Sequence, residues 1–515
     1  MPTKHSIPFR EKMHAIGLID AAKQSIRKVS LVIGVAKSTL HDNLIDYRRD
    51  IAAFELGQEQ SQRALAKDIL LISFEGKTSS RDCATILSKQ KDRKITHQRV
   101  LSVLTEIAAT ARKKNEEMLP LRSLGDDQSP LLAPLSTLKC GAFDEIFQKK
   151  SPILGFVDPT SAYIFLEPAS DRSGKSWTNF LVKLRGMGLD LESAVTDGGL
   201  GMLKSISKIF PKAVRIRDLF HVLQKLSRAS NALEGNCYRL IANYDKLAQQ
   251  QEKSEGLENL SCRMNKVISI YDELNEQIKT FHSACYFENR VGYVSSSQVK
   301  GIMDRIIALI DEAGQHRIRH RSLNEARSYL KGAGKDIVEY KATIEKLVIA
   351  KVGSIHQDTV LGYICPIIEF LDQIQRSYEN RQRLAYWTEK LTNARKNFRK
   401  FDFIDQEEVD KAIDEIASTM GLIKKSNSLI EAVNSVVRRF LVTYKSIPSW
   451  FCPIFTFYWN HRRFARGKRK GLKPKEVLTG TYLEEDWIDA LLEGHQFSDE
   501  ESSQIATENS KAQAA

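Results

Sequence analysis

The chain has 515 residues, of which 42% are hydrophobic and 27% charged, and this ordinary globular composition excludes a largely disordered or fibrous protein. Lys and Arg outnumber Asp and Glu by 77 to 64, a positive balance that favours a polyanionic partner. The seven cysteines are scattered without a Cys-x-x-Cys pair, which argues against a disulfide framework and a zinc knuckle and suits a reducing compartment.

Residues 1–115 are expected to form short helices, and they carry 21 Lys and Arg against 12 Asp and Glu. A helical apolar pattern from Ser25 stops at Gly34, and Ser38 is suited to cap a second helix that passes Tyr47. Helix, glycine turn and capped helix are the layout of a helix-turn-helix, although many small helical bundles share it. The residues on or near its groove-facing side would be Lys37, Ser38, Thr39, His41 and Asn43.

A comparable unit is predicted further along, with a capped helix over 78–88, a loop over 91–94 and a second recognition helix from Thr96. Its DNA-binding residues would be Thr96, His97, Gln98 and Arg99. Residues 116–139 follow with three prolines, a Gly-Asp-Asp turn and no period, so we predict a linker there.

From Cys140 onward, the sequence contains short segments with the composition of β-strands. Three short runs separated by turn residues, 140–147, 152–158 and 162–166, predict an antiparallel meander. A helix over 176–185, a strand over 191–196, a helix over 200–210, a strand over 213–216 and a further helix then follow. This order is that of a ribonuclease H-like fold.

The sequence therefore predicts an α+β multidomain protein whose ribonuclease H-like mixed β-sheet core is split by a large all-α insertion. The predicted domains are a helix-turn-helix region, a linker, the first part of the core, the helical insertion, the completion of the core and an acidic tail. Their bounds are 1–115, 116–139, 140–222, 223–424, 425–480 and 481–515.

Three carboxylates in this core have the surroundings of a two-metal phosphoryl-transfer site. Asp144 lies inside an apolar strand, where a carboxylate is costly unless it is paired or binds a metal. Asp197 ends the fourth strand, and the two glycines after it allow close approach of a ligand. Glu431 shares a helix face with Asn434 and Arg438, at i, i+3 and i+7. We predict that the three carboxylates are catalytic.

Other acidic residues have competing interpretations. Asp158 precedes a proline at a strand end and is interpreted as a turn residue. Glu145 would point to the opposite face of its strand, toward solvent or a supporting position. Asp218 and His221 could orient DNA or brace the site, or they could be a helix cap and a core histidine. The spacing of Asn and Arg favours Glu431 over the upstream Glu407, Glu408, Asp410, Asp414 and Glu415.

A second basic block covers residues 432–475, with 11 Lys and Arg and no acidic residue, and 10 acidic residues follow over 476–515. In its part over 455–470, aromatic residues alternate with cations. Such aromatics can stack on unpaired bases while the cations follow the phosphates, or they can simply pack a core. We predict that the aromatics pack and that the cations bind DNA. The predicted DNA-binding cations are Arg438, Arg462, Arg463, Arg466, Lys468, Arg469 and Lys470.

Taken in order, these segments resemble a DDE transposase of the bacterial insertion-sequence kind, with a helical insertion before the last glutamate. The gap of 234 residues between Asp197 and Glu431 is consistent with that inserted type. The matching segments are Asp144-Glu145, 195–199, 218–222, 427–439, Tyr458–Phe464 and 473–476.

The resemblance implies that Asp144, Asp197 and Glu431 bind two Mg²⁺ ions, with Mn²⁺ as a substitute, supported by Asp218, His221 and Asn434. One site would then serve both strand cleavage at transposon ends and strand transfer into target DNA. The implied partners are double-stranded DNA, as terminal repeats and as target, and a second copy of the chain in a dimer or higher oligomer.

We expect a cytoplasmic, nucleoid-associated bacterial protein with no membrane partner, because no run approaches the ~20 apolar residues of a membrane helix. Two alternatives remain. One is a transposase-derived DNA-binding regulator without catalysis, which the buried Asp144 disfavours. The other is a metal-dependent nuclease without strand transfer.

Overall fold

The computed structural model describes residues 9–20, 22–117, 140–148, 151–249, 255–286, 294–351, 360–377, 380–398, 413, 428–442, 444, 446–467 and 469–497. The chain forms two compact units, Met1–Glu106 with Leu492–Ala515, and Ile107–Leu491. Most of the predicted linker, the rival acidic residues over 407–415 and Lys468 lie outside the described residues.

The first unit is helical, and it begins with α1 (Phe9–Asp20), α2 (Ile26–Ile33) and α3 (Lys37–Leu70). Apolar residues of these helices, among them Ile16, Val29 and Leu40, form a small core. As predicted, α2 stops at Gly34, which adopts a left-handed conformation with φ of 73° and donates its N–H to Ser30.

The predicted cap of the next helix is wrong. Helix α3 starts at Lys37, and its N-cap is Ala36 rather than Ser38, without a side-chain cap. It passes Tyr47, as predicted, and continues for 34 residues in all. The apolar residues Leu65 and Ile69 are buried in the last turns of α3 and keep a helical spacing there.

The second pair of predicted helices is present as α4 (Ser80–Gln90) and α5 (His97–Glu117), after a π-helical turn over Leu71–Glu75. Ser79 caps α4 by accepting the backbone N–H of Asp82. Thr96 likewise accepts the N–H of Arg99 at the start of α5. The predicted helix, loop and helix are therefore present, with bounds shifted by a few residues.

The second unit contains a five-stranded mixed sheet in the order β3-β2-β1-β4-β5. Strand β1 pairs antiparallel with β2, and β2 pairs antiparallel with β3, whereas β1, β4 and β5 are parallel. The strands are β1 (Cys140–Gln148), β2 (Ser151–Val157), β3 (Ile164–Pro168), β4 (Ser193–Thr196) and β5 (Val214–Arg217). All five strands agree with the sequence prediction to within a few residues.

Alternation along β1 separates a large core from the face that carries Asp144. Phe143 packs with the aromatic and aliphatic residues of α6 (Gly174–Gly186) and α7 (Leu200–Ile209), including Trp177 and Phe180. Asp144, the next residue, points to the opposite face of the sheet. There α16 (Ser428–Leu441) packs against β1 and β2.

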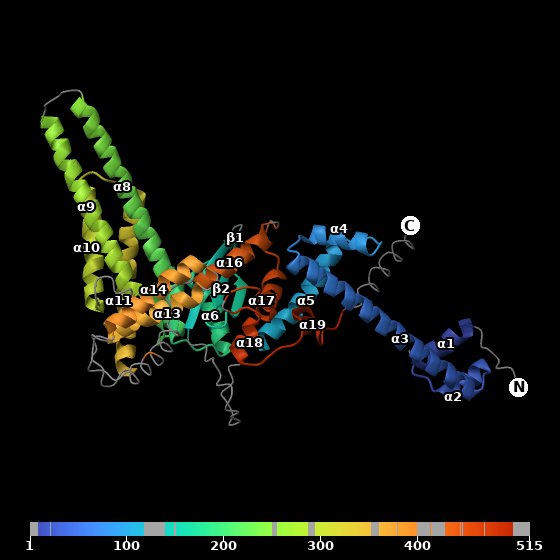
Figure 1. The fold of residues 1–515 in the computed structure, drawn as a ribbon. Coiled ribbons are helices and arrows are strands. Elements are labelled where there is room, and N and C mark those ends of the chain that lie inside the picture. The colour runs from blue at the N-terminus through green and yellow to red at the C-terminus, as the bar shows by residue number, and fades with distance from the viewer. Residues whose placement is uncertain are drawn as a thin grey trace. The chain divides into compact units, whose positions relative to one another are not determined.

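The predicted insertion is helical throughout its described part. Helices α8 (Leu219–Gln249), α9 (Glu255–Tyr286), α10 (Ser296–Gln315) and α11 (Arg321–Lys351) pack on one another in a ring of neighbours, and α11 also packs on β5 (Figure 1). A π-helical turn (Val360–Ile364), α13 (Cys365–Arg376) and α14 (Arg381–Phe398) follow.

The sheet's outer edge at β3 is covered by α17 (Phe451–His461) instead of a sixth strand. The side chain of Asn460 bonds both backbone groups of Ile164, and the hydroxyl of Thr456 accepts the N–H of Leu166. Two short helices, α18 (Pro474–Thr479) and α19 (Trp487–Leu492), end the described chain. No helix among the described residues is long and apolar enough to cross a membrane.

Candidate active site on the sheet

Asp144 lies at the centre of β1, opposite Gly155 of β2, and is only 9% exposed. One carboxylate oxygen accepts the N–H of Glu145 at 2.8 Å, and the other accepts the side-chain amide of Asn434 on α16 at 2.6 Å. Burial, together with the negative charges of Asp197 and Glu431, raises the pKa of Asp144 to about 7, although the two hydrogen bonds lower it. The three predicted carboxylates therefore interact electrostatically.

Glu431 lies in the first turn of described α16, and its side chain is 37% exposed. Its Oε1 is 3.6 Å from Nε2 of His221, and the same nitrogen is 3.8 Å from Oδ2 of Asp218. Asp218 is buried and also accepts the N–H of Phe220, so it caps the start of α8. Asp218 is therefore a helix cap, as one alternative predicted, whereas His221 is partly exposed and lies between two carboxylates rather than in the core.

Asp197 follows the last residue of β4 and is held by its own loop and by α11. Its side chain accepts the N–H of Gly199 at 3.1 Å, and its backbone carbonyl accepts the hydroxyl of Tyr329 at 2.7 Å. Gly198 has φ of +98°, and a Cβ at that position would overlap the guanidinium of Arg217. Only glycine fits both the backbone conformation and the space.

Two acidic residues that were not predicted to be catalytic, Glu145 and Asp158, form hydrogen bonds with neighbouring residues. Glu145 lies on the opposite face from Asp144, where it accepts the indole N–H of Trp177 at 3.2 Å, and burial raises its pKa. Asp158 is buried and accepts the backbone N–H groups of Thr160 and Ser161. The interpretation of Asp158 as a turn residue is thus confirmed.

The donor set of this site suits Mg²⁺, because carboxylate oxygens are the ligands that this ion prefers. The mutual repulsion that contributes to the raised pKa of Asp144 is also of the kind that a cation relieves. Over the part of the chain that the structure describes, however, no group of three His, Cys, Asp or Glu side chains is gathered so as to hold a metal ion. The carboxylates fit the ion in chemistry and would have to move closer together to bind it.

The predicted DNA-reading residues lie mostly on the surface of the first unit. Lys37, Ser38 and His41 of α3 are exposed, and Asn43 is partly buried and donates to the carbonyl of Thr39. Near the start of α5, Thr96 and Gln98 are exposed, whereas His97 and Arg99 are partly buried. Their contact with DNA stays a prediction.

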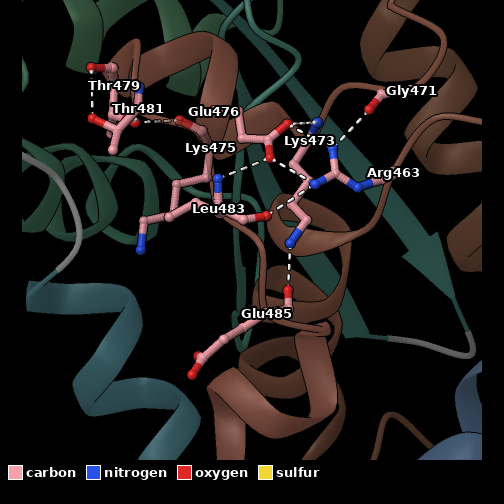
Figure 2. Close-up of polar contacts among 9 residues, drawn as sticks. All are labelled: Arg463, Gly471, Lys473, Lys475, Glu476, Thr479, Thr481, Leu483 and Glu485. Atoms are coloured by element: carbon pink, nitrogen blue, oxygen red, sulfur yellow. Dashed lines mark hydrogen bonds and ion pairs between the residues drawn. The ribbon is translucent and has the colours of Figure 1, made fainter.

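The predicted DNA-binding cations of the second unit divide into two groups. Arg463 bonds Glu476 and the carbonyls of Gly471 and Leu483, as Figure 2 shows, and Arg469 bonds the carbonyls of Pro159 and Thr160. Both guanidinium groups therefore hold loops of the chain together. Arg438, Arg466 and Lys470 are exposed, whereas Arg462 is partly buried, with its guanidinium carbon 3.9 Å from the centre of the Trp459 ring.

The aromatic residues of α17 are buried, including Phe455, Phe457 and Trp459, so the prediction that they pack a core is confirmed. The sequence reading missed the contacts of Tyr329 and Arg217 with the Asp197 loop. No local pattern marks Tyr329, because its contact joins residues that are 132 positions apart.

A comparison with protein families agrees with the transposase resemblance. Residues 162–320 match the family model described as Transposase, Mutator family. The matched segment includes Asp197, Asp218 and His221 but ends before Glu431 and begins after Asp144. No curated protein matches the sequence. The family match supports a transposase function.

Proposed function

We propose that this chain is a DNA transposase of the DDE type, which cleaves DNA at the ends of a mobile element and joins them to target DNA. The observation that carries the proposal is the buried Asp144 carboxylate at the centre of the sheet, which Asn434 binds from α16, the helix that also carries Glu431. The Mutator-family match over residues 162–320 supports the same reaction class.

The strand order supports a ribonuclease H-like core. Strands β1–β3 form an antiparallel meander, and β4 and β5 extend it in parallel beyond β1. This arrangement puts Asp144 at the sheet centre and Asp197 at the end of the adjacent strand. Helix α16, which comes after the insertion, brings Glu431 to the same face as Asp144.

Two Mg²⁺ ions, when bound by the three carboxylates, would activate water or a DNA 3′-hydroxyl and stabilise the departing 3′-oxygen at phosphorus. The residues around them have supporting roles. Asn434 orients the Asp144 carboxylate by donating to it and favours its ionised form. His221 stands between Asp218 and Glu431 and restricts the position of the Glu431 carboxylate.

DNA binding would come from basic surfaces on both units. The exposed residues at the start of α3 and α5 would read the element ends, in the manner of helix-turn-helix modules. The exposed Arg438, Arg466 and Lys470 would neutralise phosphates near the core. Because two ends must be joined, we infer that the working form is at least a dimer.

The proposal is tested with the DNA that flanks the coding region as substrate, in the presence of Mg²⁺. Asp197→Asn should abolish cleavage while end binding stays nearly intact, because the change removes one negative charge from the site and little else. Asp190→Asn, at an exposed position before β4, is the matched control and should cleave normally. Full cleavage by Asp197→Asn would rule out the assigned role.

The products separate the two alternatives. Cleaved ends that are never joined to a target DNA would favour a nuclease without strand transfer. Specific binding without any cleavage by the unaltered protein would favour a DNA-binding regulator.

A further inference from the structure

The inserted helical bundle contacts the Asp197 loop directly, through a residue of α11. The hydroxyl of Tyr329 donates to the backbone carbonyl of Asp197 at 2.7 Å, and the ammonium of Lys225 lies 5.2 Å from the centre of the Tyr329 ring. A carbonyl of the Asp197 peptide that is fixed in this way limits rotation of the backbone at the point where the carboxylate side chain begins.

A second link runs from α11 to the same loop through Arg217, the last residue of β5. Its Nε donates to Asp336 at 2.9 Å and its terminal nitrogen donates to the carbonyl of Gly332, both on α11. Arg215 also bonds the Asp336 carboxylate, at 3.1 Å. Arg217 and Asp336 are both buried, so neither charge can be released to water without a large cost.

The Arg217 guanidinium lies directly beside Gly198, the residue that follows Asp197. It occupies the space of a Cβ at Gly198, whose φ is +98°. Since Arg217 is itself held by Asp336, the position of Gly198 depends on α11 as well. Helix α11 thus holds the loop at two points. It acts directly on the Asp197 carbonyl through Tyr329, and indirectly on Gly198 through Arg217, which it binds.

We propose that Tyr329 is a positioning residue for Asp197, and that α11, through Tyr329 and the Arg217–Asp336 pair, fixes the loop that presents this carboxylate. The inference rests on the proposed function only for the role of Asp197. The insertion is then a part of the active-site scaffold rather than a spacer between the second and third carboxylates.

The first test measures hydrogen–deuterium exchange of the full-length protein without DNA. The N–H of Gly199 is bonded to the Asp197 carboxylate and therefore reports on the placement of that side chain. Tyr329→Phe removes the hydroxyl and keeps the ring. Exchange in the peptide that contains Gly199 should rise about 2- to 10-fold, the factor that corresponds to one net hydrogen bond.

The matched control is Tyr238→Phe, which removes an exposed hydroxyl bonded to Glu234 on α8 of the same bundle. It should leave exchange at Gly199 unchanged. An unchanged rate in Tyr329→Phe, or an equal rise in both variants, would overturn the proposal. Asp336→Asn should also raise exchange at Gly199, and an unchanged rate there would overturn the part that concerns Arg217.

The second test measures cleavage of end DNA at increasing Mn²⁺ concentration. Tyr329→Phe should bind DNA as tightly as the unaltered protein, cleave more slowly and need more Mn²⁺ for half-maximal cleavage. Normal cleavage with unchanged Mn²⁺ dependence would overturn the positioning role while the proposed function stands. If the unaltered protein cleaves no DNA, the proposed function fails, and the exchange measurement still decides whether Tyr329 positions Asp197.

Discussion

Replacing Asn460 with Ala tests how α17 closes the edge of the sheet. Asn460 is 1% exposed, and its side-chain amide accepts the N–H of Ile164 at 2.8 Å and donates to the carbonyl of Ile164 at 2.9 Å. The edge strand β3 therefore obtains from one side chain the pair of hydrogen bonds that a neighbouring strand would provide.

The magnitude follows from the two groups that the change leaves unpaired. Ile164 is fully buried, so water does not readily replace the lost partner. Each buried backbone group without a partner costs about 1–3 kcal/mol, which gives a loss of roughly 2–6 kcal/mol for Asn460→Ala. Such a loss is a large part of the 5–15 kcal/mol that typically stabilises a domain.

Urea unfolding followed by tryptophan fluorescence measures this loss, because Trp177 and Trp459 are buried in the same unit. Thr456→Val is the matched control, since the Thr456 hydroxyl accepts a single N–H, that of Leu166, at 3.3 Å. The control should lose about half as much as Asn460→Ala. A loss below about 1 kcal/mol in Asn460→Ala would refute the claim that this side chain completes the sheet edge.

Three further changes have defined outcomes. Burial lowers the pKa of His461 to about 3, so below pH 6.5 the unfolded chain binds a proton that the folded chain does not, and stability falls. His461→Gln should abolish about 2 kcal/mol of the stability difference between pH 7 and pH 5, measured by urea unfolding; an unchanged difference would contradict this. Gly198→Ala should lower the melting temperature and DNA cleavage, because the new Cβ overlaps Arg217, whereas Gly199→Ala, with its nearest neighbour 3.7 Å away, should do neither. Lys37→Ala should weaken binding of element-end DNA by about 1–3 kcal/mol and reduce the preference for that sequence, because Lys37 lies exposed at the start of α3; equal weakening for all sequences would mean that Lys37 contacts phosphates only.

The strand order was predictable because turn residues mark the end of each strand. The segment Pro159-Thr160-Ser161 lies between β2 and β3, and Pro211 lies between α7 and β5. The orientation of Asp144 was also predictable, because successive residues of a strand point to opposite faces of the sheet and Asp144 directly follows the apolar Phe143. Turn residues and the alternation of polar and apolar residues were sufficient to predict these features.

The features that the sequence did not predict depend on contacts between distant residues. Arg463 and Arg469 have the composition of a phosphate-binding segment, yet both bind carbonyl groups of the chain itself. Tyr329 lies in a helix of ordinary amphipathic pattern, and only the packing of α11 on β5 brings it to Asp197. The predicted cap Ser38 lies inside the helix, because α3 begins at Lys37 with Ala36 as its N-cap.

The most direct test of the central claim is a crystal structure with Mn²⁺ and end DNA, in which anomalous scattering locates the metal ions. We predict two Mn²⁺ ions that are bound by Asp144, Asp197 and Glu431 and that face the scissile phosphate. Mn²⁺ bound elsewhere, with Glu431 still paired to His221 and apart from the other two carboxylates, would contradict it.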